Sequence, residues 1–132
     1  MPKEKVYIER ILNSRSQTLI WTLIGSASGL MRWMADEVKE NEGILTFRWG
    51  EEWSHHDIHT AKVIERVRNS RLRFKWDSDD DPESYVELRM EKSDLTGAYM
   101  LCITDFAYSD DVDSIRGLWE GDLERLHRMS GL

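Results

Sequence analysis

The stretch "RLRFKWD" (71–77) alternates apolar and charged side chains at every step. Successive side chains of a β-strand point to opposite faces, so Leu72, Phe74 and Trp76 share one face and the four charged residues share the other. A strand with one apolar and one charged face is typical of an antiparallel sheet that covers a core with one side and meets water with the other. This stretch therefore predicts the central feature of the fold.

Two further segments repeat the alternation. They are "ILTFRWG" (44–50) and "YVELRME" (85–91), whose apolar faces hold Leu45, Phe47 and Trp49 in the first and Val86, Leu88 and Met90 in the second. Residues 5–12 are rich in β-forming side chains and predict an opening strand, and residues 53–64 predict a weaker one. Residues 98–107 are apolar on both faces, so we expect a strand that is covered on both sides.

Helix signals follow the opening strand. Ser14 and Gln17 have the spacing of a capping box, which marks a helix start. The next segment, "TLIWTLIG" (18–25), is apolar all round and predicts a short buried helix. A second short helix is expected over 27–34.

The C-terminal segment, from about Asp111 to Met129, has an amphipathic stripe. Apolar residues recur there at steps of three and four, namely Val112, Ile115, Trp119, Leu123, Leu126 and Met129. One-faced strands followed by such a helix predict an α+β fold in which a curved antiparallel sheet wraps around the long C-terminal helix, with two short helices after the first strand.

Composition limits the function. The chain has 132 residues, which fits one domain over 1–132, and its net charge of −7 argues against binding to nucleic acid or anionic membrane. The single cysteine, Cys102, excludes an internal disulfide and fits a reducing cytoplasm. The uncharged run 16–31 is too short for a spanning helix, and acidic residues stand where a signal peptide would be basic, so we expect neither membrane insertion nor secretion.

Several motifs carry a resemblance to a known family. "GLMRWMADEV" (29–38), "LRFKWD" (72–77), "DLTGA" (94–98), "ITDFA" (103–107) and "LWEGDLERL" (118–126) resemble the bacterial START-like domain family, which is related to the C-terminal domain of the activators of the heat-shock-chaperone ATPase. The matching positions are Gly29, Leu30, Trp33, Ala35, Asp36, Phe74, Trp76, Gly97, Ile103, Thr104, Asp105, Phe106, Leu118, Trp119 and Leu123. Relatives often begin the first helix with Ser-Pro, where this chain has Arg15-Ser16. The resemblance implies the helix-grip fold of the START and birch-pollen-allergen (SRPBCC) superfamily and a cavity between sheet and long helix, but no particular activity.

The aromatic residues suggest a ligand site in that cavity. Six Trp in this chain are explained in large part by core filling, yet a curved sheet and one helix also enclose a space that ligands use. We place its wall at Phe47, Trp49, Phe74, Trp76, Leu88, Met90, Trp119 and Leu123. Trp33 is expected at the mouth, where it would form an adaptable lid with Met31 and Met34.

Asp122 interrupts the apolar stripe of the C-terminal helix. It either lies at the margin of the stripe and reaches water, or serves as a polar group that orients a ligand, in which case burial should raise its pKa. Tyr85 is a second candidate for orienting the ligand.

Other chemistry finds little support. One face of the expected strand carries His55, Asp57 and His59, beside His56, and these residue types can bind a metal ion. A solvent-exposed polar strand face explains them as well. "DSDDDPE" (77–83) lacks the Gly and Glu of a calcium loop, so we expect a solvated hairpin loop. Cys102 is expected to be an inert core thiol. We therefore predict no metal and no cofactor.

Three functions remain open on the sequence. The first is a cytoplasmic protein that binds a small apolar or amphipathic ligand. The second is a protein-interaction module that acts on a chaperone or another protein, which predicts a filled core and an exposed patch. The third is an enzyme of the cyclase or dehydratase kind, which needs an acid or base directed into the cavity, although no catalytic motif appears.

Overall fold

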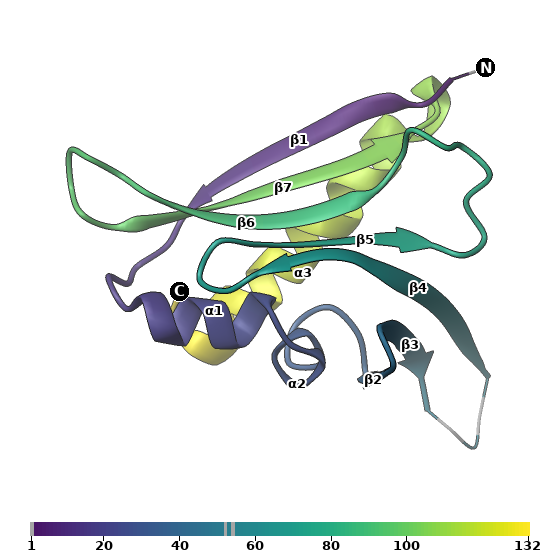
Figure 1. Ribbon diagram of the computed structural model, residues 1–132, viewed down its shortest axis with the longest axis horizontal. Coiled ribbons are helices and arrows are strands. Elements are labelled where there is room, and N and C mark those ends of the chain that lie inside the picture. Colours follow the sequence, from purple (N-terminus) through teal and green to yellow (C-terminus); the bar gives the residue numbers. More distant parts are fainter. Residues whose placement is uncertain (1, 52, 54) are drawn as a thin grey trace.

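The computed structural model describes residues 2–51, 53 and 55–132, and within them one antiparallel sheet dominates. Its strands are β1 (Glu4–Ile11), β2 (Glu37–Asn41), β3 (Ile44–Gly50), β4 (His56–Val67), β5 (Arg71–Trp76), β6 (Val86–Lys92) and β7 (Tyr99–Ala107). They are arranged in the order β1-β7-β6-β5-β4-β3-β2 (Figure 1). Strands β2 to β7 therefore form a meander, and β1 closes it by pairing with β7.

The helices cover one face of this sheet. Helices α1 (Gln17–Ile24) and α2 (Ala27–Leu30) lie in the connection between β1 and β2, which leads from one edge of the sheet to the other. A turn of 3-10 helix, η1 (Ser109–Asp111), leads into the long helix α3 (Val112–Ser130), which runs across the concave face of the sheet (Figure 1). The predicted α+β helix-grip architecture is confirmed.

The alternation of "RLRFKW" is realised as predicted. Leu72 and Phe74 are fully buried and pair across β5 and β6 with Leu88 and Val86. Phe74 also lies 5.6 Å from the ring of Phe47 on β3. The apolar faces of neighbouring strands thus converge on one core beneath α3, which burial of apolar surface stabilises.

Several secondary-structure predictions were wrong in detail, and among them the second short helix ends at Leu30 and not at residue 34. Strand β2 was missed because "EVKEN" carries four polar side chains and buries only Val38, as an edge strand allows. Helix α1 is capped by Ser16, whose Oγ accepts from the Leu19 N–H at 3.2 Å, and not by Ser14. The same helix is not buried all round, since Leu19 is 41% exposed.

The strand expected over 53–64 is shifted toward the C-terminus. It is β4, which begins at His56 and ends at Val67, and a bulge between Val63 and Glu65 interrupts its pairing with β5. Bulges bend a strand and increase its twist, which fits the curvature of β4 in Figure 1. Ser54 of the expected strand lies outside the described residues.

Strand β7 is buried on both faces, but not by two layers. Leu101 and Ile103 belong to the core beneath α3, whereas Cys102 and Thr104 point to the convex face. Among the described elements no helix packs on that face, and Tyr7 of β1 and Arg89 of β6 lie next to the Cys102 thiol instead. The prediction that both faces of this strand are buried is therefore right, but the convex face is buried by neighbouring side chains and not by a second layer.

Gly29 explains the close contact of the two short helices. A Cβ atom there would lie 1.9 Å from the Thr22 carbonyl oxygen of α1. Only glycine lets α1 and α2 approach to this distance, so the stretch that begins at Gly29 starts directly against α1.

Candidate functional site

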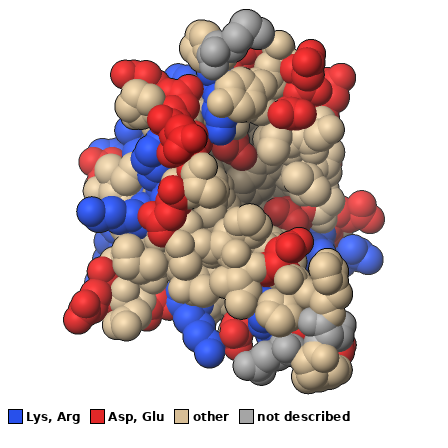
Figure 2. Space-filling view, turned by 90° about the vertical axis from the view of Figure 1, so that its right-hand side faces the viewer, with Lys and Arg blue, Asp and Glu red and all other residues tan. Residues whose placement is uncertain are grey.

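A cavity of about 340 Å³ lies between the sheet and the N-terminal half of α3. The strands contribute Trp49 from β3, Asp57 and His59 from β4, Trp76 from β5 and Asp105 from β7, and helix α3 contributes Ile115, Leu118, Trp119 and Asp122, with Met34 and Ser78 from connecting segments. On the side of the molecule drawn in Figure 2, a recess lies among uncharged side chains, with acidic side chains close to its rim.

Three indole rings form most of the apolar wall, and two of them are held by hydrogen bonds. The Trp49 Nε1 donates to the Met34 carbonyl oxygen at 2.9 Å, and the Trp119 Nε1 donates to Asp105 Oδ2 at 2.8 Å. The Trp76 ring lies 4.9 Å from the Phe47 ring and 6.2 Å from the Trp49 ring. Because partners fix these rings, the wall is formed before any ligand arrives.

Two carboxyl groups border the same space. Asp105 is half-buried, and burial raises its pKa even though the Trp119 indole and the Phe106 N–H donate to it. Asp122 is also half-buried, and loss of solvent raises its pKa to about 7, although the nearby Arg125 acts in the opposite direction. Asp122 therefore lies at the border of the cavity as a half-buried group of raised pKa, and its role in orienting a ligand stays a prediction.

The predicted ligand-binding residues separate into two groups. Trp49, Trp76, Trp119 and Asp122 line the cavity. The others do not line it and are buried in the core, namely Trp33, Phe47, Phe74, Leu88, Met90 and Leu123. The strand and helix patterns placed the wall residues on the inner side, but most of that side is filled by packing.

Trp33 is not a lid, which corrects the expectation from the sequence. Its side chain is fully buried, its Nε1 donates to the Leu23 carbonyl oxygen at 2.9 Å, and its ring lies 6.3 Å from that of Trp119. The indole thus satisfies a carbonyl in the last turn of α1 and supports the cavity wall from behind. Met34 does line the cavity, whereas Met31 is exposed and is not among the lining residues.

Sequence reasoning missed several lining residues. For Asp105 the signal was present, because Leu101, Ile103 and Asp105 follow one another on the inner face of β7. For Asp57 and His59 the shared strand face was recognised but was considered only for metal binding. Within the described residues no group of three or more His, Cys, Asp or Glu side chains is placed to hold a metal ion.

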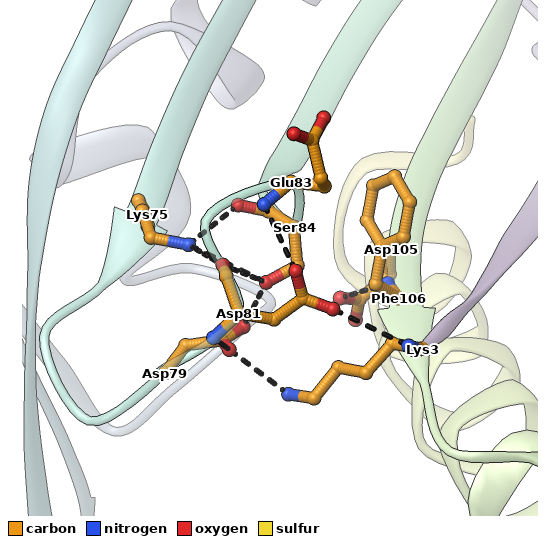
Figure 3. Close-up of polar contacts among 8 residues, drawn as sticks. All are labelled: Lys3, Lys75, Asp79, Asp81, Glu83, Ser84, Asp105 and Phe106. Atoms are coloured by element: carbon orange, nitrogen blue, oxygen red, sulfur yellow. Dashed lines mark hydrogen bonds and ion pairs between the residues drawn. The ribbon is translucent and has the colours of Figure 1, made fainter. Parts of the chain in front are cut away.

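The loop between β5 and β6, which contributes Ser78 to the cavity lining, is held by a polar network (Figure 3). Asp79 accepts a hydrogen bond from the Ser84 hydroxyl and pairs with Lys3 at 3.2 Å, and Asp81 accepts from the Lys3 N–H at 3.3 Å. Lys75 donates to the carbonyl oxygens of Asp81 and Ser84. These bonds satisfy the carboxylates of Asp79 and Asp81 within the protein. The Tyr85 ring makes an edge-on contact with Phe106 outside the cavity lining.

A curved antiparallel sheet that grips one long helix around an apolar cavity defines a helix-grip domain. The chain belongs to the START-like superfamily, because the family model described as a START-like superfamily domain matches residues 1–132. No curated protein matches the chain. None of the described helices is long and apolar enough to cross a membrane.

Solved structures agree with this assignment. A protein from Bacteroides fragilis is 34% identical, with a TM-score of 0.64 over 97% of this chain and 91% of that one. An AHSA1-like protein from Aeromonas hydrophila is 17% identical, with a TM-score of 0.75 over 95% and 90% of the two chains. One chain of the Aha1 dimer from Colwellia psychrerythraea is 14% identical, with a TM-score of 0.71 over 93% and 92%. The last two show similarity of fold alone.

Proposed function

We propose that this protein binds a small apolar or amphipathic molecule in the cavity between the sheet and α3. The observation that carries this proposal is a space of about 340 Å³ with three indole rings in its wall and two carboxyl groups of raised pKa at its border. Ligand sites are typically apolar clefts of ~300–1,000 Å³ with a few polar groups that orient the ligand. The cavity lies at the small end of that range, so a compact ligand is expected.

The arrangement of the wall supports binding over simple core filling. Trp49 and Trp76 are only half-buried although they point to the inner side of the sheet. Half-buried indoles at an opening leave apolar surface in contact with water, and its removal by a ligand would be favourable. Because the rings are already held by hydrogen bonds and neighbouring rings, little conformational entropy is lost on binding.

The protein-interaction alternative has weaker support. It predicts a filled core, whereas the space beneath the sheet is not filled at the end where α3 begins. Similarity to the Aha1 structures is a similarity of fold, from which no partner follows. A cytoplasmic location stays a prediction.

The enzyme alternative gains one observation. Asp122 borders the cavity with a pKa raised to about 7, so it holds or releases a proton near neutral pH. A dehydratase, or a cyclase that closes a ring by condensation, would release one water from its substrate. The test is to incubate the retained molecule with the native protein and with Asp122→Asn. If its mass falls by one water with the native protein only, the enzyme alternative replaces simple binding.

The direct test is native mass spectrometry of the protein purified from its own host, followed by denaturing extraction. We expect a retained small molecule that is absent from the Ile115→Phe variant, because a larger side chain at this lining position occupies the cavity. Ile64→Phe is the matched control, since Ile64 lies on β4, is 53% exposed and is outside the lining. Equal retention by both variants would show that the molecule binds elsewhere.

A second test covers ligands that are lost during purification. Trp49, Trp76 and Trp119 make the intrinsic fluorescence sensitive to occupation of the cavity. A panel of lipids and aromatic metabolites should contain compounds that change the emission of native protein and of Ile64→Phe, but not of Ile115→Phe. If no compound in a broad panel changes the emission, and nothing is retained in the mass spectrum, the proposed function is wrong.

A further inference from the structure

The charged residues around the cavity are all of one sign, apart from one histidine. Asp57, Asp105 and Asp122 border it, and among the described lining residues no Lys or Arg occurs. His59 is the remaining titratable side chain of the lining. The cavity is therefore an aromatic space with acidic groups, in a protein whose net charge is already −7.

The two inner carboxyl groups lack a close cation. In the described part of the chain neither Asp105 nor Asp122 has an ion pair within 4.0 Å. Arg125 acts on Asp122 only through longer-range attraction, and one of its guanidinium nitrogens lies 3.4 Å from the Trp33 carbonyl oxygen, to which it donates. Lys3, the cation that acts on Asp105, is engaged with Asp79 at 3.2 Å. Burial without a counter-charge is the reason that the pKa of both carboxyl groups is raised.

The ring arrangement offers a cation further contacts. The rings of Trp49, His59 and Trp76 lie 5.7–6.2 Å from one another and form a corner with aromatic faces and edges. The negative face of an indole attracts an ammonium or guanidinium group, most strongly where water is excluded. A carboxylate adds a charge-assisted hydrogen bond to the same group.

Building on the proposed ligand-binding function, we propose that the ligand is an organic cation, an apolar or aromatic body that carries a positively charged amine. The body lies against the indole wall, and the amine meets Asp122, with Asp105 nearby. An anionic ligand would face only acidic groups and a histidine. Above pH 7, where Asp122 releases its proton, a neutral ligand would leave this ionised carboxyl group without a counter-charge.

The test compares three molecules of equal shape and different charge: 4-phenylbutylamine, 4-phenylbutanol and 4-phenylbutyrate. Binding is followed by two-dimensional NMR of the indole N–H signals at about pH 8, where histidine side chains are ordinarily neutral. The signals of Trp49, Trp76 and Trp119 report on the cavity, and that of Trp21 on α1 serves as the internal control because this residue does not line it.

The three probes separate the possible results. We expect the amine to shift the cavity signals and to bind at least about tenfold more tightly than the alcohol, with the carboxylate weakest. If the alcohol or the carboxylate binds as tightly as the amine, the inference about charge is overturned, while the cavity remains a ligand site. If none of the three shifts the cavity signals, both this inference and the proposed function fail for compounds of this size.

Asp122→Asn tests the role of the carboxyl group itself. It keeps the shape of the side chain and removes the charge, so amine affinity should fall about tenfold while alcohol affinity stays the same. Glu124→Gln is the matched control, because it removes one negative charge from an exposed position of the same helix outside the lining. An equal loss of affinity in both variants would show that only the net charge of the protein matters and would overturn the assignment of Asp122.

Discussion

The stability of an Asp122→Asn variant, compared with that of the native chain at the same pH, should increase as the pH rises. Burial raises the pKa of the Asp122 carboxyl from its ordinary value of 3.8 to about 7 in the folded protein. Between these two values the folded state holds a proton that the unfolded chain has released, so the free energy of unfolding falls as the pH rises through this range. An amide does not ionise, and the variant escapes this loss.

The size of the effect follows from the two pKa values. The rise of the pKa from 3.8 to about 7 corresponds to a loss of at most ~4 kcal/mol in the free energy of unfolding once Asp122 is ionised. Asp122 is only half-buried, and water screens part of the penalty, so we expect ~1–2 kcal/mol. The amide carries its own cost of burial, but that cost does not depend on pH and cancels when two pH values are compared.

The assay is urea unfolding of both proteins at about pH 5 and about pH 8, followed by tryptophan fluorescence. The stability difference between Asp122→Asn and the native protein should shift in favour of the variant by ~1–2 kcal/mol between the two conditions. All other titrating groups, including Asp105, are present in both proteins and cancel. Glu124→Gln, at an exposed position of the same helix, should show no such shift.

The reasoning fails if the difference between variant and native protein is the same at both pH values. A shift in the opposite direction would mean that the ionised carboxyl gains a partner on folding, with Arg125 the obvious candidate. An NMR titration of the Asp122 carboxyl provides the direct check, because an ordinary aspartate pKa would remove the buried-acid interpretation.

Four further predictions concern the packing of the fold. Gly29→Ala should destabilise the protein by ~1–3 kcal/mol, because a methyl group has no room between α1 and α2. By contrast Gly117→Ala, on α3 with nothing within 4 Å of the new methyl group, should stabilise it by about 1 kcal/mol, and urea unfolding checks both. Trp33→Phe removes a buried N–H donor and should cost ~1–3 kcal/mol by the same measurement, since a carbonyl oxygen of α1 loses its partner. Cys102 is buried with a raised pKa, so a disulfide reagent should label it far more slowly in native protein than in urea, and rapid labelling of the native protein would contradict its placement.

The strands and helices could be predicted from the sequence where apolar residues recur at a regular interval, because that interval indicates which side chains are buried. Leu72 and Phe74 on β5 and Trp119 and Leu123 on α3 are buried as their spacing requires. A sheet and a helix each repeat their side-chain directions at a constant interval, so one apolar face is visible in the sequence itself. Strand β2 escaped this reading because an edge strand buries so little that pairing with β3 defines it.

The candidate site was only partly predictable, because its members come from separate elements. Trp49 and Trp76 could be placed on the inner face, but so could Phe47 and Phe74, and nothing in the local pattern separates wall from core. The role of Trp33 depended on the Leu23 carbonyl oxygen, which lies in a different helix.

The pattern of residues along the chain was enough to show which strand side chains face inward, that a long helix covers them, and that the net charge is negative. It did not show where the inner face stays unfilled or that Asp105 and Asp122 border the same space, because both follow from the folded arrangement. The physical reason is that side-chain direction follows from the dihedral angles of each residue, whereas a cavity is the space left between a bent sheet and a straight helix. That space depends on the curvature and position of all the elements at once, and no single stretch of the chain encodes it.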